Sequence, residues 1–207
     1  PGSIMLSAIE QKLANIEGRE SRLADCLRKI DGQFDWVVLD CGPAMGLLSI
    51  NAIVAADIVL IPVETGYFSL RSVERTRDTV ELVGQRTGRR PHMVIIPTMY
   101  DPRTKSDREA YRRLKNQFDG LLSDTTIRFN AKLKEAASKG SPITEYFPGC
   151  RGHHDYQALA QELMALSFQL ALNDDRAEAE QSLAEQSAEV EALTAVALGA
   201  NVVDGGV

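Results

Sequence analysis

The sequence lacks the features that mark disulfide-rich, zinc-binding and membrane proteins. Its three cysteines, Cys26, Cys41 and Cys150, are widely spaced and form no C-x-x-C pair, so neither a disulfide framework nor a zinc site is predicted. No signal peptide is visible, and Asp57 and Pro62 interrupt the longest apolar stretch, which is therefore no membrane span. These absences predict a protein of the reducing cytoplasm.

A glycine-rich phosphate loop is also absent. No Gly-x-x-x-x-Gly-Lys-Ser/Thr motif occurs in the 207 residues. Such a loop needs glycines so that backbone N–H groups can converge on the phosphates, and a lysine to neutralise their charge. We therefore expect no catalytic residue in this chain and no ATP turnover by the chain alone.

Charge divides the chain into two parts. Residues 174–207 carry eight acidic residues and one basic residue, a net charge of −7, so the preceding 173 residues carry +1 of the total of −6. With 44% hydrophobic residues, the chain can build one domain with a core. We predict a folded domain over 1–173 and an acidic, partly helical or disordered tail over 174–207.

Hydrophobic patterns predict strands that alternate with helices. Short apolar runs predict strands buried on both faces at residues 34–40, 58–63 and 93–97. A weaker strand is predicted at residues 125–127. Helical periodicity predicts helices that begin near Ser7, Ala44, Gly66, Ser106 and His153, the last with Tyr156 and Leu159 facing the core. This alternation indicates an α/β fold with a doubly wound, mostly parallel sheet and flanking helices.

Asp40 stands out because it follows the first apolar run and precedes a Gly42-Pro43 turn. Open α/β sheets bind ligands at the carboxyl ends of their strands. In phosphate-binding proteins an acid there holds Mg²⁺, usually through water, because this ion gives up its hydration shell reluctantly. The alternative is an aspartate that only caps the next turn.

Several segments together resemble the ParA/Soj-type partition ATPases of the ParA/MinD P-loop family. DCGPAMGLLSINA (40–52) and ADIVLIPVE (56–64) are similar to the family's Walker B region. TMYDPRT (98–104), IRFNAKLKEAASKGSPI (127–143) and the helix over 146–163 resemble later family segments in family order. The resemblance spans about residues 3–172, and it implies a P-loop NTPase-like fold that is incomplete at its N-terminus.

The resemblance also implies a nucleotide site. The intact protein would bind ATP and Mg²⁺, the metal through water on Asp40, and the nucleotide near Asp40, Gly42, Pro43, Met99, Tyr100 and Asn130. One departure lies in the key motif, where the family usually has Pro-Pro and this chain has Gly42-Pro43.

A basic cluster is the strongest binding signal. Residues 103–139 contain ten bases and five acids, and three bases at i, i+4 and i+7 form a single stripe on the predicted helix after Ser106. The family resemblance implies that such residues bind DNA without sequence preference; here they are Arg103, Arg108, Arg112, Lys115, Arg128, Lys132 and Lys134. The alternative is a solvated helix face.

These patterns favour a ParA-like partitioning ATPase domain. The resemblance implies an ATP-dependent homodimer, a ParB-like activator, non-specific DNA as partner and a nucleoid-associated location. One alternative is a non-catalytic binding module without a P-loop. A MinD-type membrane positioner is a weaker alternative, because a tail of net charge −7 would be repelled by anionic lipid.

Overall fold

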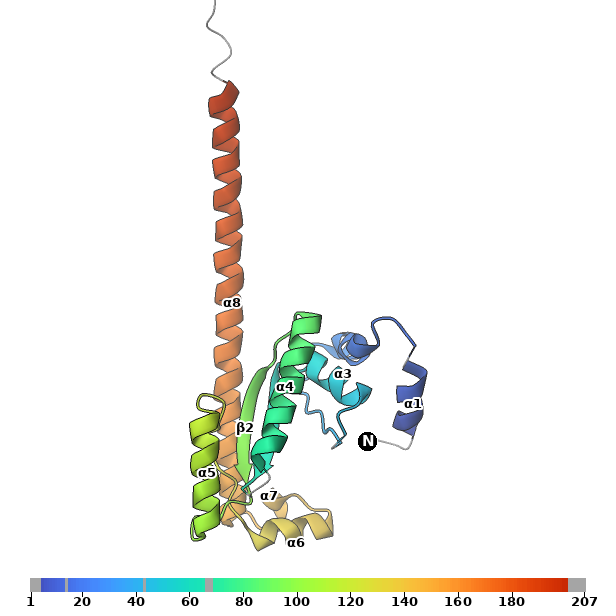
Figure 1. Ribbon diagram of the computed structural model, residues 1–207, viewed down its shortest axis with the longest axis vertical. Coiled ribbons are helices and arrows are strands. Elements are labelled where there is room, and N and C mark those ends of the chain that lie inside the picture. The colour runs from blue at the N-terminus through green and yellow to red at the C-terminus, as the bar shows by residue number, and fades with distance from the viewer. Residues whose placement is uncertain (1–4, 14, 43, 66–68, 201–207) are drawn as a thin grey trace, which may run out of the picture. The chain divides into compact units, whose positions relative to one another are not determined.

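The structure is a computed structural model that describes residues 5–13, 15–42, 44–65 and 69–200. The chain forms two compact units, residues 1–159 and 160–207. The long helix α8, Arg151–Ala200, contributes its first turns to the first unit and the remainder to the second (Figure 1). Among the helices described, none is both long and apolar enough to cross a membrane.

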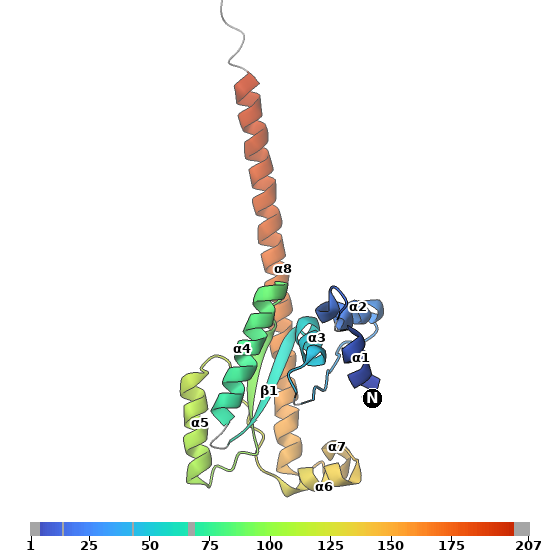
Figure 2. The same cartoon turned by 45° about the vertical axis from the view of Figure 1, so that its right-hand side comes forward.

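A parallel strand pair forms the centre of the first unit. Strands β1, Ile58–Glu64, and β2, His92–Thr98, pair in register from Ile58 opposite His92 to Glu64 opposite Thr98. Helix α4, Ser69–Thr87, connects them and lies along the strands (Figure 2). A parallel pair needs such a crossover, because a short turn cannot return the chain to the same end.

The main core packs helices α4 and α5 onto this sheet. Helix α5, Lys105–Gln117, contributes Leu114, which is fully buried together with Ile95 of β2 and Val73 of α4. Strand β2 is buried over four consecutive residues, and a second neighbour lies on its other edge: the Ile95 N–H donates to the Leu121 carbonyl at 2.7 Å. The sheet therefore continues past β2 through irregular extended chain rather than through a third regular strand.

Short helices complete the first unit. They are α1 (Met5–Leu13), η1 (Arg19–Ser21), α2 (Arg22–Leu27), η2 (Arg28–Ile30), α3 (Leu47–Ala55), α6 (Ala131–Lys139) and α7 (Ile143–Tyr146). The buried Asn51 of α3 joins two of them, because its side chain accepts from the Leu23 N–H at 3.1 Å and donates to the Arg19 carbonyl at 2.9 Å. Residues Ile53 and Val54 of α3 pack against α4.

The α/β fold class and the strands at 58–63 and 93–97 are confirmed, each strand within one residue. The helices predicted after Ala44, Gly66 and Ser106 are also present. The predicted boundary between the folded domain and the acidic tail, at residues 173/174, rests on composition and stays a prediction. Helix α8 continues across this boundary.

The strand predicted at 34–40 is wrong. This segment pairs with no other among the described residues, and most of its apolar side chains are exposed, Phe34 by 65% and Val38 by 86%. A buried strand needs neighbours that satisfy its backbone and cover its side chains. An apolar run by itself supplies neither backbone hydrogen-bond partners nor cover for its side chains. The hydrophobic pattern alone therefore predicted a strand that does not form here.

Three smaller predictions are also corrected. The cap of helix α5 is Thr104, two residues before the predicted cap Ser106, because the Thr104 side chain accepts from the Asp107 N–H. Residues 125–127 form no strand, although Ile127 is buried and its N–H donates to the Pro97 carbonyl. Tyr156 is 47% exposed rather than core-facing, whereas Leu159 is buried as predicted.

Candidate nucleic-acid interface

The loop after β2 brings two sequence-distant segments together. Tyr100 forms a parallel bridge with Arg128, in which the Tyr100 N–H donates to the Ile127 carbonyl and the Phe129 N–H donates to the Tyr100 carbonyl. Met99 has φ of 55°, a left-handed conformation that is uncommon for a residue with a side chain. This strained turn directs the chain away from the sheet and into the Asp101–Arg103 loop.

Asp101 and Arg103 form a local clamp in this loop. The Arg103 guanidinium donates to both Asp101 carboxylate oxygens at 2.7–3.2 Å, and the Arg103 N–H donates to the same carboxylate at 3.0 Å. These hydrogen bonds lower the pKa of Asp101 from 3.8 to about 2. Asp101 is therefore ionised at every physiological pH, and Arg103 brings no unbalanced charge to the loop.

We predict that the Asp101 carboxyl titrates near pH 2. Because the pKa is lower in the folded state, the clamp stabilises the fold above the ordinary pKa of 3.8, and this contribution is lost as the pH falls through about 2. Carboxyl-detected NMR over a pH series measures the titration directly. The variant Arg103→Gln should return the pKa towards 3.8, and a wild-type Asp101 that already titrates there would contradict the clamp.

Arg128 is held by a buried carboxylate from α8. Asp155 is 6% exposed and accepts from the Arg128 backbone N–H at 3.0 Å and from its Nε at 3.1 Å, and it also pairs with Nη2. This hydrogen bonding raises the pKa of Arg128 further. The ion pair fixes the 127–130 segment against the first turns of α8.

Helix α6 presents two lysines in different states. Asn130 caps this helix, because its side chain accepts from the Lys132 N–H at 2.9 Å. The Lys132 ammonium pairs with Glu135 at 2.7 Å, which raises the pKa of Lys132 and lowers that of Glu135. Lys134 is exposed, and its Nζ lies 5.3 Å from the centre of the Phe129 ring, a cation–π contact.

The bases of the predicted stripe on α5 also differ from one another in their internal contacts. The Arg108 guanidinium donates to the carbonyls of Pro102 and Arg103 at 2.8 and 2.9 Å, so it braces the clamp loop. Arg112 and Lys115 are exposed on α5, and neither forms an ion pair with another of the described residues. These two bases can meet an external anion without breaking an internal contact.

The predicted Walker B residues lie on a separate segment. Asp40 and Gly42 are exposed in irregular chain, and a Cβ added at Gly42 would meet nothing within 4 Å. The Cys41 thiol beside them has a raised pKa, first because of partial burial and then because of the Asp40 charge. Pro43 lies outside the described residues. No cluster of three His, Cys, Asp or Glu side chains suited to a metal occurs in the described part of the chain.

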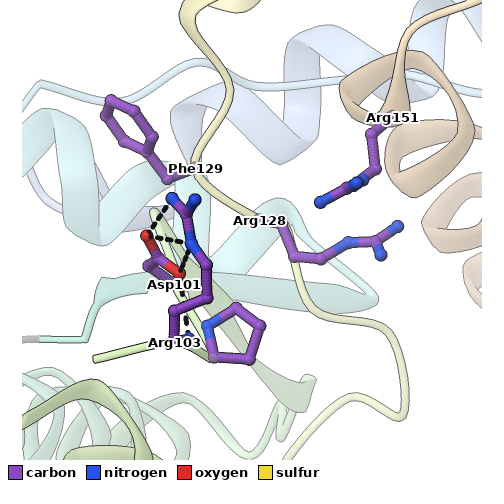
Figure 3. Close-up of a pocket in the computed structure, with 6 residues that line it drawn as sticks. Asp101, Arg103, Arg128, Phe129 and Arg151 are labelled. Carbon is purple, nitrogen blue, oxygen red and sulfur yellow. Dashed lines mark hydrogen bonds and ion pairs between the residues drawn. The ribbon is translucent and has the colours of Figure 1, made fainter. Parts of the chain in front are cut away.

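Sequence reasoning missed two residues of this region. Asp155 and Arg151 both lie at the start of α8, and Arg151 lines a cavity together with the clamp loop and Arg128 (Figure 3). The pairing of Arg128 with Asp155 joins residues 27 positions apart, and no local pattern marks it. No local signal marks Arg151 either, because it is the only lysine or arginine in the sequence between Lys139 and Arg176.

Comparison with known proteins defines the class. The described fold matches the crystal structure of cobyrinic acid a,c-diamide synthase from Mycobacterium smegmatis with bound ATP analog and magnesium, with a TM-score of 0.68, 27% identity and coverage of 79% of this chain and 61% of that one. It also matches the crystal structure of the cell division ATPase MinD of Pyrococcus furiosus, with a TM-score of 0.58, 17% identity and coverage of 71% of this chain and 59% of that one, so the fold is that of the ParA/MinD P-loop NTPases. A family profile described as AAA domain matches residues 1–95.

Curated relatives define the family. The chain is 36% identical over 167 residues to the sporulation initiation inhibitor protein Soj of Bacillus subtilis, covering 80% of this chain and 66% of Soj. It is 34% identical to the chromosome partitioning protein ParA of Myxococcus xanthus, covering 79% of this chain and 58% of that protein. This chain belongs to the ParA/Soj family of partitioning ATPases. It spans 52–66% of the length of the curated relatives that it matches.

Proposed function

We propose that this chain is the DNA-contacting part of a ParA-like ATPase that segregates DNA or positions cargo. In this proposal, the intact protein binds ATP and Mg²⁺, forms an ATP-gated dimer and binds DNA without sequence preference. A ParB-like activator would stimulate turnover, and the protein would work in the cytoplasm on the nucleoid. The chain by itself would be inactive, because its sequence contains no phosphate-binding loop.

The observation that carries the proposal is the pair of uncommitted bases on α5. Arg112 and Lys115 are exposed, whereas three other bases of the 103–139 cluster are held by internal partners: Arg103 by Asp101, Arg128 by Asp155 and Lys132 by Glu135. Bases held in this way keep a fixed geometry, whereas free bases gain most from pairing with phosphate. A surface of this kind suits contacts to a phosphate backbone, which fix position and carry no base information.

We expect the 207-residue chain to bind DNA weakly, with a dissociation constant of roughly 10⁻⁴–10⁻⁶ M at physiological salt. Unrelated DNA sequences should bind alike. Replacing Arg112 by Ala should make the dependence of log K on log salt less steep by about one unit, because one fewer counterion is released. Lys132→Ala should have a smaller effect than Arg112→Ala, since Lys132 must first leave Glu135.

Fluorescence anisotropy across a salt series measures these slopes. Lys29→Ala is the matched control, because Lys29 is an exposed base on η2, outside the 103–139 cluster. A slope for Arg112→Ala that equals the slopes of the wild type and of Lys29→Ala would mean that the α5 bases are only a solvated face. DNA binding that depends strongly on base sequence would also contradict the proposal.

A non-catalytic binding module is the second candidate, and the missing phosphate loop favours it. The two candidates differ in their response to nucleotide. DNA binding by the intact protein should strengthen with ATP if the partition ATPase is correct. DNA binding by the intact protein that does not change when ATP is added would favour the non-catalytic binding module.

A further inference from the structure

Over residues 160–200 the second unit is a single helix, the C-terminal part of α8 (Figure 1). A soluble helix gains most of its stability by packing an apolar face against another element. Within the described part of this unit there is no other helix or strand to supply such packing. An apolar face on this helix is therefore covered from outside the unit or stays in water.

Three large apolar side chains form a row on this helix, which we call the apolar row. Met164, Phe168 and Leu172 follow one another at intervals of four residues, so they lie within a sector of about 80° around the helix axis. Their side chains are exposed by 58%, 66% and 52%. Rows at i, i+4 and i+8 are the ridges that fit into the grooves of a second helix. The apolar row therefore has the geometry of a helix–helix contact.

An acidic segment follows the apolar row along the helix. Residues 174–185 contain five acids and one base, a net charge of −4, whereas residues 163–173 contain no charged residue. The one base, Arg176, pairs with Glu180 of the same helix at 2.9 Å. The helix therefore presents an apolar half followed by a negatively charged half.

A second copy of this helix does not match such a surface. In a parallel pair the two apolar rows would meet, but the two acidic segments, each of net charge −4, would also lie side by side. In an antiparallel pair that aligns the apolar rows, each acidic segment would face residues 151–162 of the other copy, which carry a net charge of −1 with neutral histidines. Like charges repel at this separation, which is within the Debye length of about 8 Å. Charge complementarity therefore requires a basic partner.

We infer that residues 164–185 of α8 form a docking surface for a helix of another protein that is apolar in one half and basic in the other. The apolar half of the partner covers the apolar row, and its basic half neutralises the acidic segment. The two halves together fix the register, because a shift along the helix would place apolar side chains against carboxylates. The inference is independent of the proposed function, since it involves neither nucleotide nor DNA.

Fluorescence anisotropy of a labelled synthetic peptide tests this surface on the whole 207-residue chain. The leucine–lysine peptide has the length of residues 164–185, with leucines four residues apart in one half and lysines in the other, and it is made with both orders of the halves. One twin peptide replaces the lysines by glutamates, and the other replaces the leucines by serines. We expect the leucine–lysine peptide to bind about tenfold more tightly than either twin, because each twin loses one of the two contributions. Its affinity should fall as salt is added.

Leu172→Ser should weaken binding of the leucine–lysine peptide about tenfold, because the apolar row loses part of its buried area. Leu82→Ser is the matched control, since Leu82 lies on α4 and is 50% exposed, close to the 52% of Leu172. This control variant should bind the peptide like the wild type.

The double variant Asp175→Lys with Glu185→Lys should reverse the charge preference, so that it binds the glutamate twin more tightly than the leucine–lysine peptide. Both carboxylates are exposed on α8. The control is Asp31→Lys with Asp119→Lys, which changes the net charge equally at two exposed positions of the first unit. It should keep the preference for lysine. A reversed preference cannot result from a loss of folding.

The inference is overturned if neither order of the leucine–lysine peptide binds more tightly than its twins, if Leu172→Ser binds it like the wild type, or if the double variant on α8 keeps the preference for lysine. Sedimentation equilibrium of the chain alone decides the competing occupant. A dimer that Leu172→Ser dissociates and Leu82→Ser does not would make the apolar row a contact between copies, and it would also overturn the inference. None of these measurements contains DNA or ATP, so their failure leaves the proposed function standing.

Discussion

Replacing Asp155 by alanine is expected to lower the free energy of unfolding by about 2–4 kcal/mol. Asp155 is 6% exposed and accepts hydrogen bonds from the Arg128 backbone N–H and from its guanidinium. Removing one partner of such a pair leaves the other without compensation. The effect should lie towards the lower end of the range for buried ion pairs, because the Arg128 side chain is 38% exposed and can regain water.

Denaturant unfolding followed by circular dichroism measures the difference. Asp155→Asn should cost less, because the amide oxygen still accepts from the Arg128 N–H. Asp119→Ala is the control: Asp119 is exposed and follows the buried Phe118, so its removal should change stability by less than about 0.5 kcal/mol. If Asp155→Ala unfolds at the same denaturant concentration as Asp119→Ala, the pair does not hold the 127–130 segment.

The 207-residue chain is expected to show no micromolar binding of ATP. Its sequence contains no glycine-rich loop with a lysine, so nothing matches the groups that cradle a triphosphate, and Asp40 remains as the predicted anchor on the Mg²⁺ side. Calorimetric titration with ATP and Mg²⁺ tests this directly. Micromolar binding by this chain would contradict the prediction.

Fusing the phosphate-loop segment of a ParA/Soj relative to this chain should create ATP turnover, which Asp40→Ala should then lower by about 100-fold. The carboxylate would act through a metal-bound water, and the loss of such outer contacts typically costs 10–100-fold in metal affinity or activity. Asp35→Ala is the matched control, because Asp35 is an exposed carboxylate on the same segment. Equal turnover in the two variants would make Asp40 a structural residue.

The regular elements of the sheet could be predicted because their signals are local. Residues 58–63 and 93–97 are short apolar runs between turn residues, and they form β1 and β2. The same signal failed at 34–40, where Phe34 and Val38 are exposed. A run of apolar residues indicates which side chains can be buried. A strand forms only where another segment supplies backbone hydrogen bonds and covers those side chains.

The candidate interface could be predicted only as a set of bases. Composition indicated the basic residues between Arg103 and Lys139, and helical spacing put Arg112 and Lys115 on one stripe. Spacing could not reveal that Arg108 binds backbone carbonyls, or that Lys132 pairs with Glu135. It also gave no reason to include Arg151, which reaches the cavity from a helix that begins 23 residues after Arg128.

The amino-acid sequence by itself determined the family, the α/β class and the concentration of positive charge, because motifs, hydrophobic period and composition are properties of neighbouring residues. The tertiary structure decided which of those charges are free. Asp155 neutralises Arg128, Asp101 neutralises Arg103, and Arg151 is left facing a cavity. The physical reason is that the pairing of charges depends on distance in space, and the buried Asp155 reaches Arg128 only after α8 has packed against the 127–130 segment.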